Sequence, residues 1–156
     1  MAWWFGGLVV VLTYSEIKAG LESLNLKKHY VIAHASVRSF GGIDGGVETL
    51  LQALIDSTRG IIMPAFTYRT MLNTDVGPAN NGMVYGTQGD LNKMAEPFHL
   101  DMPVDPMMGI LPEAARKHPG AKRSTHPIQS FAGIHADAII HSQNIFNPLA
   151  PIGLLG

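Results

Sequence analysis

The sequence predicts an α/β fold built around a partly parallel sheet. Three successive segments carry this prediction: a β-favouring run at residues 30–33, a helical apolar pattern at 47–55 and a second apolar run at 60–66. A strand, a helix and a strand in this order indicate a right-handed βαβ unit. Because ligands of such sheets bind at the carboxyl ends of the strands, we expect a site near Ser36 and residues 66–68.

The composition indicates one domain. The chain has 156 residues, of which 46% are hydrophobic, so we interpret residues 13–156 as belonging to a single domain. Eleven basic and twelve acidic side chains give a net charge of −1, which lacks the basic excess of a nucleic-acid binder. The absence of cysteine excludes disulfides and zinc–thiolate sites, and is compatible with a reducing, cytoplasmic location.

Residues 1–12 form an uncharged and mostly apolar leader whose role the sequence does not explain. The run is shorter than the roughly 20 residues that span a bilayer. It also lacks the basic region and the cleavage site of a signal peptide. We therefore expect neither a membrane anchor nor secretion.

An N-terminal helix is predicted by a capping box at Thr13 and Glu16, where each side chain binds the backbone of the other residue. Apolar residues follow at helical spacing up to Asn25. Beyond the βαβ unit, the pattern predicts a helix at 110–118, a strand at 128–134 and a short helix at 135–142.

A glycine-rich turn at residues 41–46 precedes the helix at 47–55. Glycines let the backbone approach a ligand closely, and the free N–H groups of a helix start favour an anionic or carbonyl oxygen. The turn has neither the Lys-Ser/Thr pair of a triphosphate-binding loop nor the G-x-G-x-x-G order of a dinucleotide site. A connection without any ligand is equally consistent with these residues.

Residues 69–106 show no sustained periodicity, which predicts a long loop. Such a loop could offer carboxylates to a cationic substrate, or it could be a solvated acidic surface. Its acidic residues are Asp75, Asp90, Glu96, Asp101 and Asp105.

The segment 123–131 combines a guanidinium, two hydroxyl groups and an imidazole. Pro127 disfavours the helical conformation at His126, so we expect His126 on extended backbone. Ser124 then shares a face with His126. Either Ser124 is a nucleophile with His126 as its base, or His126 acts directly on a substrate amine while Ser124 orients the acyl donor.

Two other kinds of site are poorly supported. The chain has no G-x-S-x-G elbow, so the serine-hydrolase interpretation is weak. The histidines lack the H-x-x-x-H spacing of a metal site. We therefore expect no bound metal.

Several short motifs follow one another along the chain: Ala33-His34-Ala35-Ser36-Val37, Gly42 to Gly46, Met63-Pro64-Ala65-Phe66-Thr67, Asp105-Pro106-x-x-Gly109, Pro112-Glu113 and Arg123-Ser124-x-His126-Pro127-x-x-Ser130-Phe131. In order and spacing they resemble the aminoglycoside 3-N-acetyltransferase family, which is distinct from the GNAT acetyltransferases. The resemblance extends over roughly residues 13–149.

The resemblance implies a three-layer α/β/α fold with a mixed sheet, and acetyl transfer from acetyl-CoA to the 3-amino group of the 2-deoxystreptamine ring of an aminoglycoside, which confers resistance. It implies His126 as general base, with Ser124 beside it at the thioester. The residues implied in cofactor binding are Ser36, Val37, Gly42, Gly45, Gly46, Met63 and Arg123.

The chain also departs from the family pattern. Ala35 stands where family members usually have a second serine, and residues 132–135 differ from a fuller Ala-Ala-x-Gly sequence. The family continues past the equivalent of Pro148, through further strands and an acidic residue that supports the histidine. We therefore expect a fold that is incomplete at its C-terminus, and the alternative function is a truncated, non-catalytic CoA-binding or structural remnant. The resemblance leaves the oligomeric state open.

Overall fold

A four-stranded sheet lies at the centre of the structure, a computed structural model that describes residues 11–80, 84–86 and 92–154. Its strands lie in the order β2-β4-β6-β5. β2 pairs with β4 in parallel, whereas β6 is antiparallel to both β4 and β5. The bounds of these strands are Tyr30–Ile32 for β2, Gly60–Pro64 for β4, Ala121–Arg123 for β5 and Phe131–Ile134 for β6.

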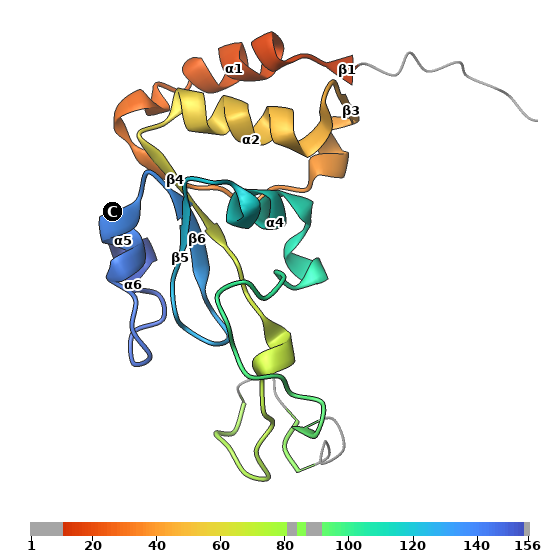
Figure 1. Cartoon of the computed structure of the whole chain (residues 1–156), viewed down its shortest axis with the longest axis vertical. Coiled ribbons are helices and arrows are strands. Elements are labelled where there is room, and N and C mark those ends of the chain that lie inside the picture. The colour runs from red at the N-terminus through yellow and green to blue at the C-terminus, as the bar shows by residue number, and fades with distance from the viewer. Residues whose placement is uncertain (1–10, 81–83, 87–91, 155–156) are drawn as a thin grey trace, which may run out of the picture.

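Helices and one smaller strand pair complete the described fold (Figure 1). A separate parallel pair joins β1, Val11–Leu12, to β3, Gly42–Ile43. The helices are α1 Tyr14–Glu22, α2 Gly46–Ser57, α4 Ile110–Lys117, α5 Asp137–His141 and α6 Ala150–Gly153.

The predicted βαβ unit is confirmed, because α2 connects the parallel strands β2 and β4. The apolar period of α2 buries Leu50, Leu51 and Leu54 against the sheet side of the helix. Gly60 begins β4 at a close backbone approach. A Cβ atom there would lie 2.5 Å from the carbonyl oxygen of His135, so only glycine fits without a shift.

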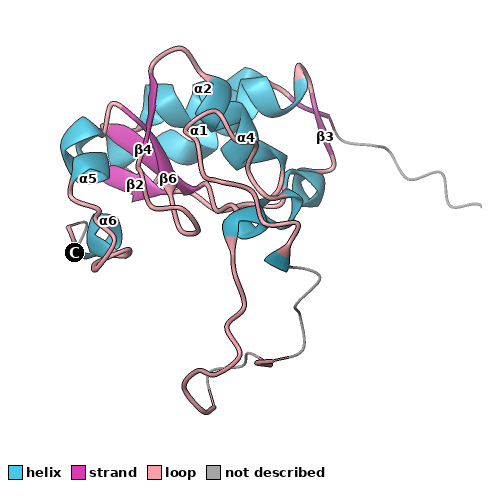
Figure 2. Ribbon diagram, turned by 60° about the horizontal axis from the view of Figure 1, so that its bottom comes forward, coloured by secondary structure: helices cyan, strands magenta, loops and turns pink. Residues whose placement is uncertain are grey.

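Helices cover both faces of the sheet, and Figure 2 shows α1, α2 and α4 on one side of the strands with α5 and α6 on the other. The alternation of side chains along β4 explains the two layers. Ile61 and Met63 belong to the core that includes α2 and α4. Ile62 packs with Ile139 and Ile140 of α5 on the opposite face. The predicted fold class is confirmed.

The local predictions agree with the structure to within two residues for the helices α4 and α5. The capping box of α1 is also confirmed. The backbone N–H of Glu16 donates to Thr13 Oγ1 at 3.3 Å, and the backbone N–H of Thr13 donates to Glu16 Oε2 at 2.9 Å.

The C-terminal part of the sheet differs from the prediction. Residues 128–134 were expected to form one strand, but β6 begins at Phe131 because residues 127–129 form a turn. The preceding strand β5 was not predicted, since its three residues, Ala-Lys-Arg, carry no apolar alternation. The result is a β5–β6 hairpin whose connecting loop, residues 124–130, holds both proposed catalytic residues.

Three further expectations are only partly covered by the structure. Residues 1–10 of the predicted leader lie outside the described residues, while Val11 and Leu12 form β1. The described part of segment 69–106 contains no β-strand, as predicted. Among the described helices, none combines the length and the apolar character needed to cross a bilayer.

Candidate functional site

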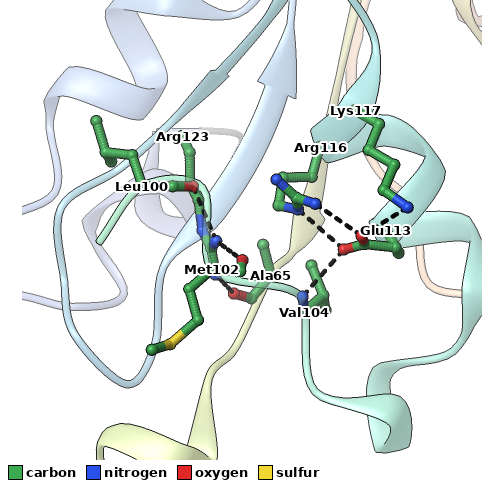
Figure 3. A network of polar contacts seen from close by, with 8 residues as sticks. All are labelled: Ala65, Leu100, Met102, Val104, Glu113, Arg116, Lys117 and Arg123. Carbon is green, nitrogen blue, oxygen red and sulfur yellow. Dashed lines mark hydrogen bonds and ion pairs between the residues drawn. The ribbon is translucent and has the colours of Figure 1, made fainter. Parts of the chain in front are cut away.

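Arg123, the last residue of β5, makes five hydrogen bonds around the end of β4. Figure 3 shows those to the carbonyl oxygens of Ala65, Leu100 and Met102. Its Nη2 atom donates to the carbonyl oxygen of Ala65 at 2.7 Å and to Thr67 Oγ1 at 3.2 Å. Nε donates to Ser130 Oγ at 3.1 Å. Nη1 donates to the carbonyl oxygen of Leu100 at 3.1 Å and to that of Met102. Arg123 therefore joins the end of β4, the β5–β6 loop and the segment at residues 100–104, which precedes α4.

These five acceptors match the five N–H groups of a guanidinium. In this arrangement Arg123 has no N–H group left for a cofactor. Burial lowers the pKa of Arg123 to about 10, so the side chain remains charged at neutral pH. The guanidinium also lies 5.2 Å from the centre of the Phe98 ring, a cation–π contact.

A second polar network connects the segment at residues 100–104 to α4 (Figure 3). Glu113 accepts two hydrogen bonds from Arg116, at 2.9 and 2.7 Å, and pairs with Lys117 at 3.2 Å. It also accepts the backbone N–H of Val104 at 3.0 Å. The Arg116 hydrogen bond is the main reason that the pKa of Glu113 falls to about 2. Glu113 is therefore ionised at any physiological pH.

The β5–β6 loop is attached to the residues that follow β4. Thr67 Oγ1 and Thr70 Oγ1 both donate to the carbonyl oxygen of Pro127, at 3.1 and 2.8 Å. The backbone N–H of Thr67 donates to the carbonyl oxygen of Ile128 at 2.9 Å. These bonds fix the turn that follows His126, so the position of the imidazole depends on residues some sixty positions earlier.

His126 is half-buried, and its ring accepts two hydrogen bonds from this turn. The backbone N–H groups of Ile128 and Gln129 donate to His126 Nδ1 at 3.2 and 3.0 Å. Burial lowers the pKa of His126 below its usual value. Burial therefore favours the neutral imidazole, which is the form that a general base requires.

Ser124 closes the hairpin. Its side chain is 4% exposed, and Oγ accepts the backbone N–H of Phe131 at 2.8 Å, while the backbone N–H of Ser124 donates to the carbonyl oxygen of Phe131 at 2.9 Å. The Ser124 hydroxyl keeps its own proton for a further acceptor. Ser124 lines a cavity of about 480 Å³ that extends along β5.

Ser36 and Val37 lie in a different hollow, of about 380 Å³. Pro106 and Gly109 line it from the opposite side, immediately before α4. The fold thus brings together the motif at residues 33–37 and the motif at residues 105–109, which are far apart in the sequence. Neither Ser124 nor His126 lines this cavity.

The remaining proposed cofactor residues occupy the start of α2 and the core. Gly45 and Gly46 have φ angles of 75° and 69°, a left-handed conformation that favours glycine and turns the chain into α2. Gly42 belongs to β3 and pairs with Val11. Met63 is fully buried beneath α2 and α4, so any effect on a ligand is indirect.

The prediction from sequence missed Thr67 and Thr70, although Thr67 ends the motif that starts at Met63. Their hydroxyl groups support the turn beside His126 through a backbone carbonyl, which has no residue-specific signature. Within the described part of the chain, no three His, Cys, Asp or Glu side chains gather in a way that could hold a metal ion.

A family model described as aminoglycoside 3-N-acetyltransferase matches residues 32–156, from the last residue of β2 through α2, β4 and the β5–β6 hairpin. This chain belongs to the aminoglycoside 3-N-acetyltransferase family. The match covers every proposed site residue, from Ser36 to His126.

Two curated members of the aminoglycoside 3-N-acetyltransferase family illustrate the similarity. The SPbeta prophage-derived aminoglycoside N(3')-acetyltransferase-like protein YokD of Bacillus subtilis is 30% identical in an alignment that covers 92% of this chain and 56% of YokD. Aminoglycoside N(3)-acetyltransferase IX of Micromonospora chalcea is 31% identical over 79% of this chain and 44% of its own length. The chain spans about half the length of these relatives.

Solved structures of the family share the fold. The crystal structure of YokD superposes with a TM-score of 0.72 at 29% identity, over 91% of this chain and 56% of YokD. AAC-VIa bound to sisomicin gives a TM-score of 0.66 at 27% identity, over 86% of this chain and 51% of AAC-VIa. AAC-IIIb, solved as a binary complex with CoASH, shows the same fold at 23% identity, with a TM-score of 0.62 over 83% of this chain and 48% of AAC-IIIb.

Proposed function

We propose that this chain takes part in acetyl transfer from acetyl-CoA to the 3-amino group of an aminoglycoside, in the cytoplasm, and thereby contributes to antibiotic resistance. The observation that carries the proposal is the family match over residues 32–156, which includes the half-buried His126 in the β5–β6 loop, where burial lowers the pKa of the imidazole. The same-family structures bound to sisomicin or CoASH support these two ligand classes.

In the proposed reaction, the substrate nitrogen attacks the thioester carbonyl carbon, a C–N bond forms, and the C–S bond breaks to release CoA. The nitrogen loses one proton, and the CoA thiolate gains one. His126 is the proposed acceptor of the nitrogen's proton, because an imidazole titrates near neutral pH. Ser124 is proposed to donate its hydroxyl proton in a hydrogen bond to the thioester oxygen. Ser36, Val37 and the turn at 42–46 are proposed to bind the pantetheine arm.

The test is CoASH release from acetyl-CoA in the presence of a panel of aminoglycosides, for the wild-type chain and the variant His126→Asn. Asparagine can still accept the backbone N–H groups of the turn, so the variant separates loss of chemistry from loss of folding. The matched control is His118→Asn, since His118 also precedes a proline and accepts the backbone N–H of Gly120 at 3.1 Å. We expect turnover in wild type and control and at least a hundredfold loss in His126→Asn.

A second function, the non-catalytic CoA-binding remnant, is favoured by one observation: Ser36 and Val37 line a hollow of about 380 Å³ that neither Ser124 nor His126 lines. Stabilisation by acetyl-CoA in a thermal-shift assay, combined with no CoASH release on any amine, would support the remnant and exclude the enzyme. Equal turnover by wild type and His126→Asn would refute the role of His126.

A further inference from the structure

The two hydrogen bonds accepted by His126 determine which ring nitrogen carries the proton. Ile128 and Gln129 both direct a backbone N–H group at Nδ1, at 3.2 and 3.0 Å. A nitrogen that accepts N–H groups has its lone pair in use and bears no hydrogen. In a neutral imidazole the proton must then lie on Nε2.

The opposite orientation of the ring does not fit the turn. Rotation of the imidazole by half a turn would put a ring carbon where Nδ1 now lies. The N–H groups of Ile128 and Gln129 would then lose their acceptor, and an unpaired N–H group in a half-buried turn costs free energy comparable to a lost hydrogen bond. The turn therefore selects both the orientation of the ring and its tautomer.

Among the described residues, no charged group near His126 opposes this choice. Burial is the one cause that lowers its pKa, and no charged neighbour contributes. Among the residues that the structure describes, the hydrogen bonds of His126 are the two with Ile128 and Gln129. No described carboxylate accepts an N–H group from the ring.

We infer that the turn at residues 127–129 holds His126 in the Nε2–H tautomer, so that this fold presents a hydrogen-bond donor at Nε2. The catalytic meaning of the tautomer rests on the acetyl transfer proposed above. An Nε2–H group can bind the carbonyl oxygen of a thioester, but it cannot accept the proton of the substrate nitrogen. The general-base role proposed above therefore requires that the lone pair of Nε2 is freed first. Nε2 gains that lone pair only when Nδ1 exchanges its two backbone donors for an acceptor, such as a carboxylate.

The chain contains a matched reference for this arrangement. His118 also precedes a proline and is half-buried like His126, but its Nδ1 atom accepts one backbone N–H group, from Gly120 at 3.1 Å, in an exposed hydrogen bond. His126 accepts two such groups in a half-buried setting. Loss of the ring should therefore destabilise the fold more at position 126 than at position 118.

The first experiment is nitrogen-15 NMR of the imidazole rings of the full chain without ligands, above the pKa of His126. The His126 signals are identified by their loss in His126→Asn. We expect two well-separated nitrogen resonances, with the proton coupled to Nε2 and an unprotonated, hydrogen-bonded Nδ1. A proton on Nδ1, or averaged resonances from mixed tautomers, would overturn the inference.

The second experiment compares melting temperatures. We expect His126→Ala to lower the melting temperature by several degrees more than His118→Ala. His126→Asn should recover most of that loss, because its side-chain oxygen replaces Nδ1 as acceptor. Equal melting temperatures for His126→Ala and His126→Asn would show that the two N–H bonds are not formed, and would also overturn the inference.

Neither experiment uses a substrate, so the inference and the proposed function fail separately. An Nε2–H tautomer in a chain that acetylates nothing leaves the inference in place and removes the proposed function. If Nδ1 carries the proton and turnover depends on His126, the proposed function stays in place and the inference about the tautomer is removed.

Discussion

Arg123 Nη2 lies 2.7 Å from the carbonyl oxygen of Ala65, to which it donates a hydrogen bond across the intervening strand β6. Ala65 directly follows β4, and Arg123 ends β5. This contact connects two strands that are not neighbours in the sheet. Arg123 directly precedes the loop that carries His126, so a positive charge lies at the base of this loop.

The first prediction concerns this contact. Arg123→Lys should lower the free energy of unfolding by about 2–4 kcal/mol, because an ammonium group cannot reproduce the planar fork that bonds five acceptors. Urea denaturation would show a lower midpoint with an unchanged slope. Arg38→Lys, an exposed site, is the matched control and should remain within about 0.5 kcal/mol of wild type. Equal losses of stability in Arg123→Lys and Arg38→Lys would contradict a stabilising role of the five Arg123 hydrogen bonds.

The second prediction concerns pH and Glu113. Its pKa is lowered to about 2 in the folded chain, against 4.5 for the free side chain. A lowered folded pKa contributes stability that is present above pH 4.5 and is lost as the pH falls toward 2. As the pH falls from 4.5 to 2, the free energy of unfolding should decrease by roughly 2 kcal/mol more in wild type than in Glu113→Gln.

Urea unfolding at a series of pH values measures this difference. The matched control is Glu22→Gln, because Glu22 forms an exposed pair with Lys18 at 3.8 Å. The control should follow wild type throughout the series. Parallel curves for wild type and Glu113→Gln would contradict the prediction.

The third prediction compares two glycines. Gly60→Ala should destabilise the fold by about 2–4 kcal/mol, since the new Cβ atom meets the backbone oxygen of His135. Gly20 lies in α1, and a Cβ atom added there would meet nothing within 4 Å. Gly20→Ala should therefore stabilise the fold by about 0.5–1 kcal/mol. Chemical denaturation should show a lower free energy of unfolding for Gly60→Ala and a higher one for Gly20→Ala than for wild type. A change of the same sign in both variants would refute the prediction.

The fourth prediction concerns the start of α1. Thr13→Ala should cost about 1 kcal/mol, because the Glu16 N–H loses its acceptor and the capping box is broken. Thr13→Ser keeps the oxygen and should cost less than half as much. Thermal or urea unfolding of the pair tests this order, and a reversed order would show that the methyl group matters more than the cap.

The fifth prediction concerns the hollow beside Ser36. If the pantetheine arm binds there as proposed, Ser36→Trp should weaken acetyl-CoA binding at least tenfold by filling the 380 Å³ cavity. Ser39→Trp is the control, because Ser39 is exposed nearby but does not line the cavity. Isothermal titration calorimetry measures both. Unchanged affinity in Ser36→Trp would place the cofactor elsewhere.

Much of the fold was predictable because its signals are local. The capping box of α1 and the apolar period of α2 each lie within one helix, and the strand–helix–strand order gave the parallel pair correctly. β5 was missed because three residues with one half-buried alanine carry no pattern. It is defined only by its pairing with β6.

The sequence by itself determined the family, the βαβ unit and the identity of the chemical groups near position 126, because these depend on residue types and short spacings. Tertiary structure alone decided what those groups bind. Arg123 pairs with the carbonyl groups of residues 23 and 58 positions away, and His126 accepts backbone N–H groups from its own turn. Nearly every residue offers the same backbone groups, so no side-chain pattern in the sequence can specify these partners.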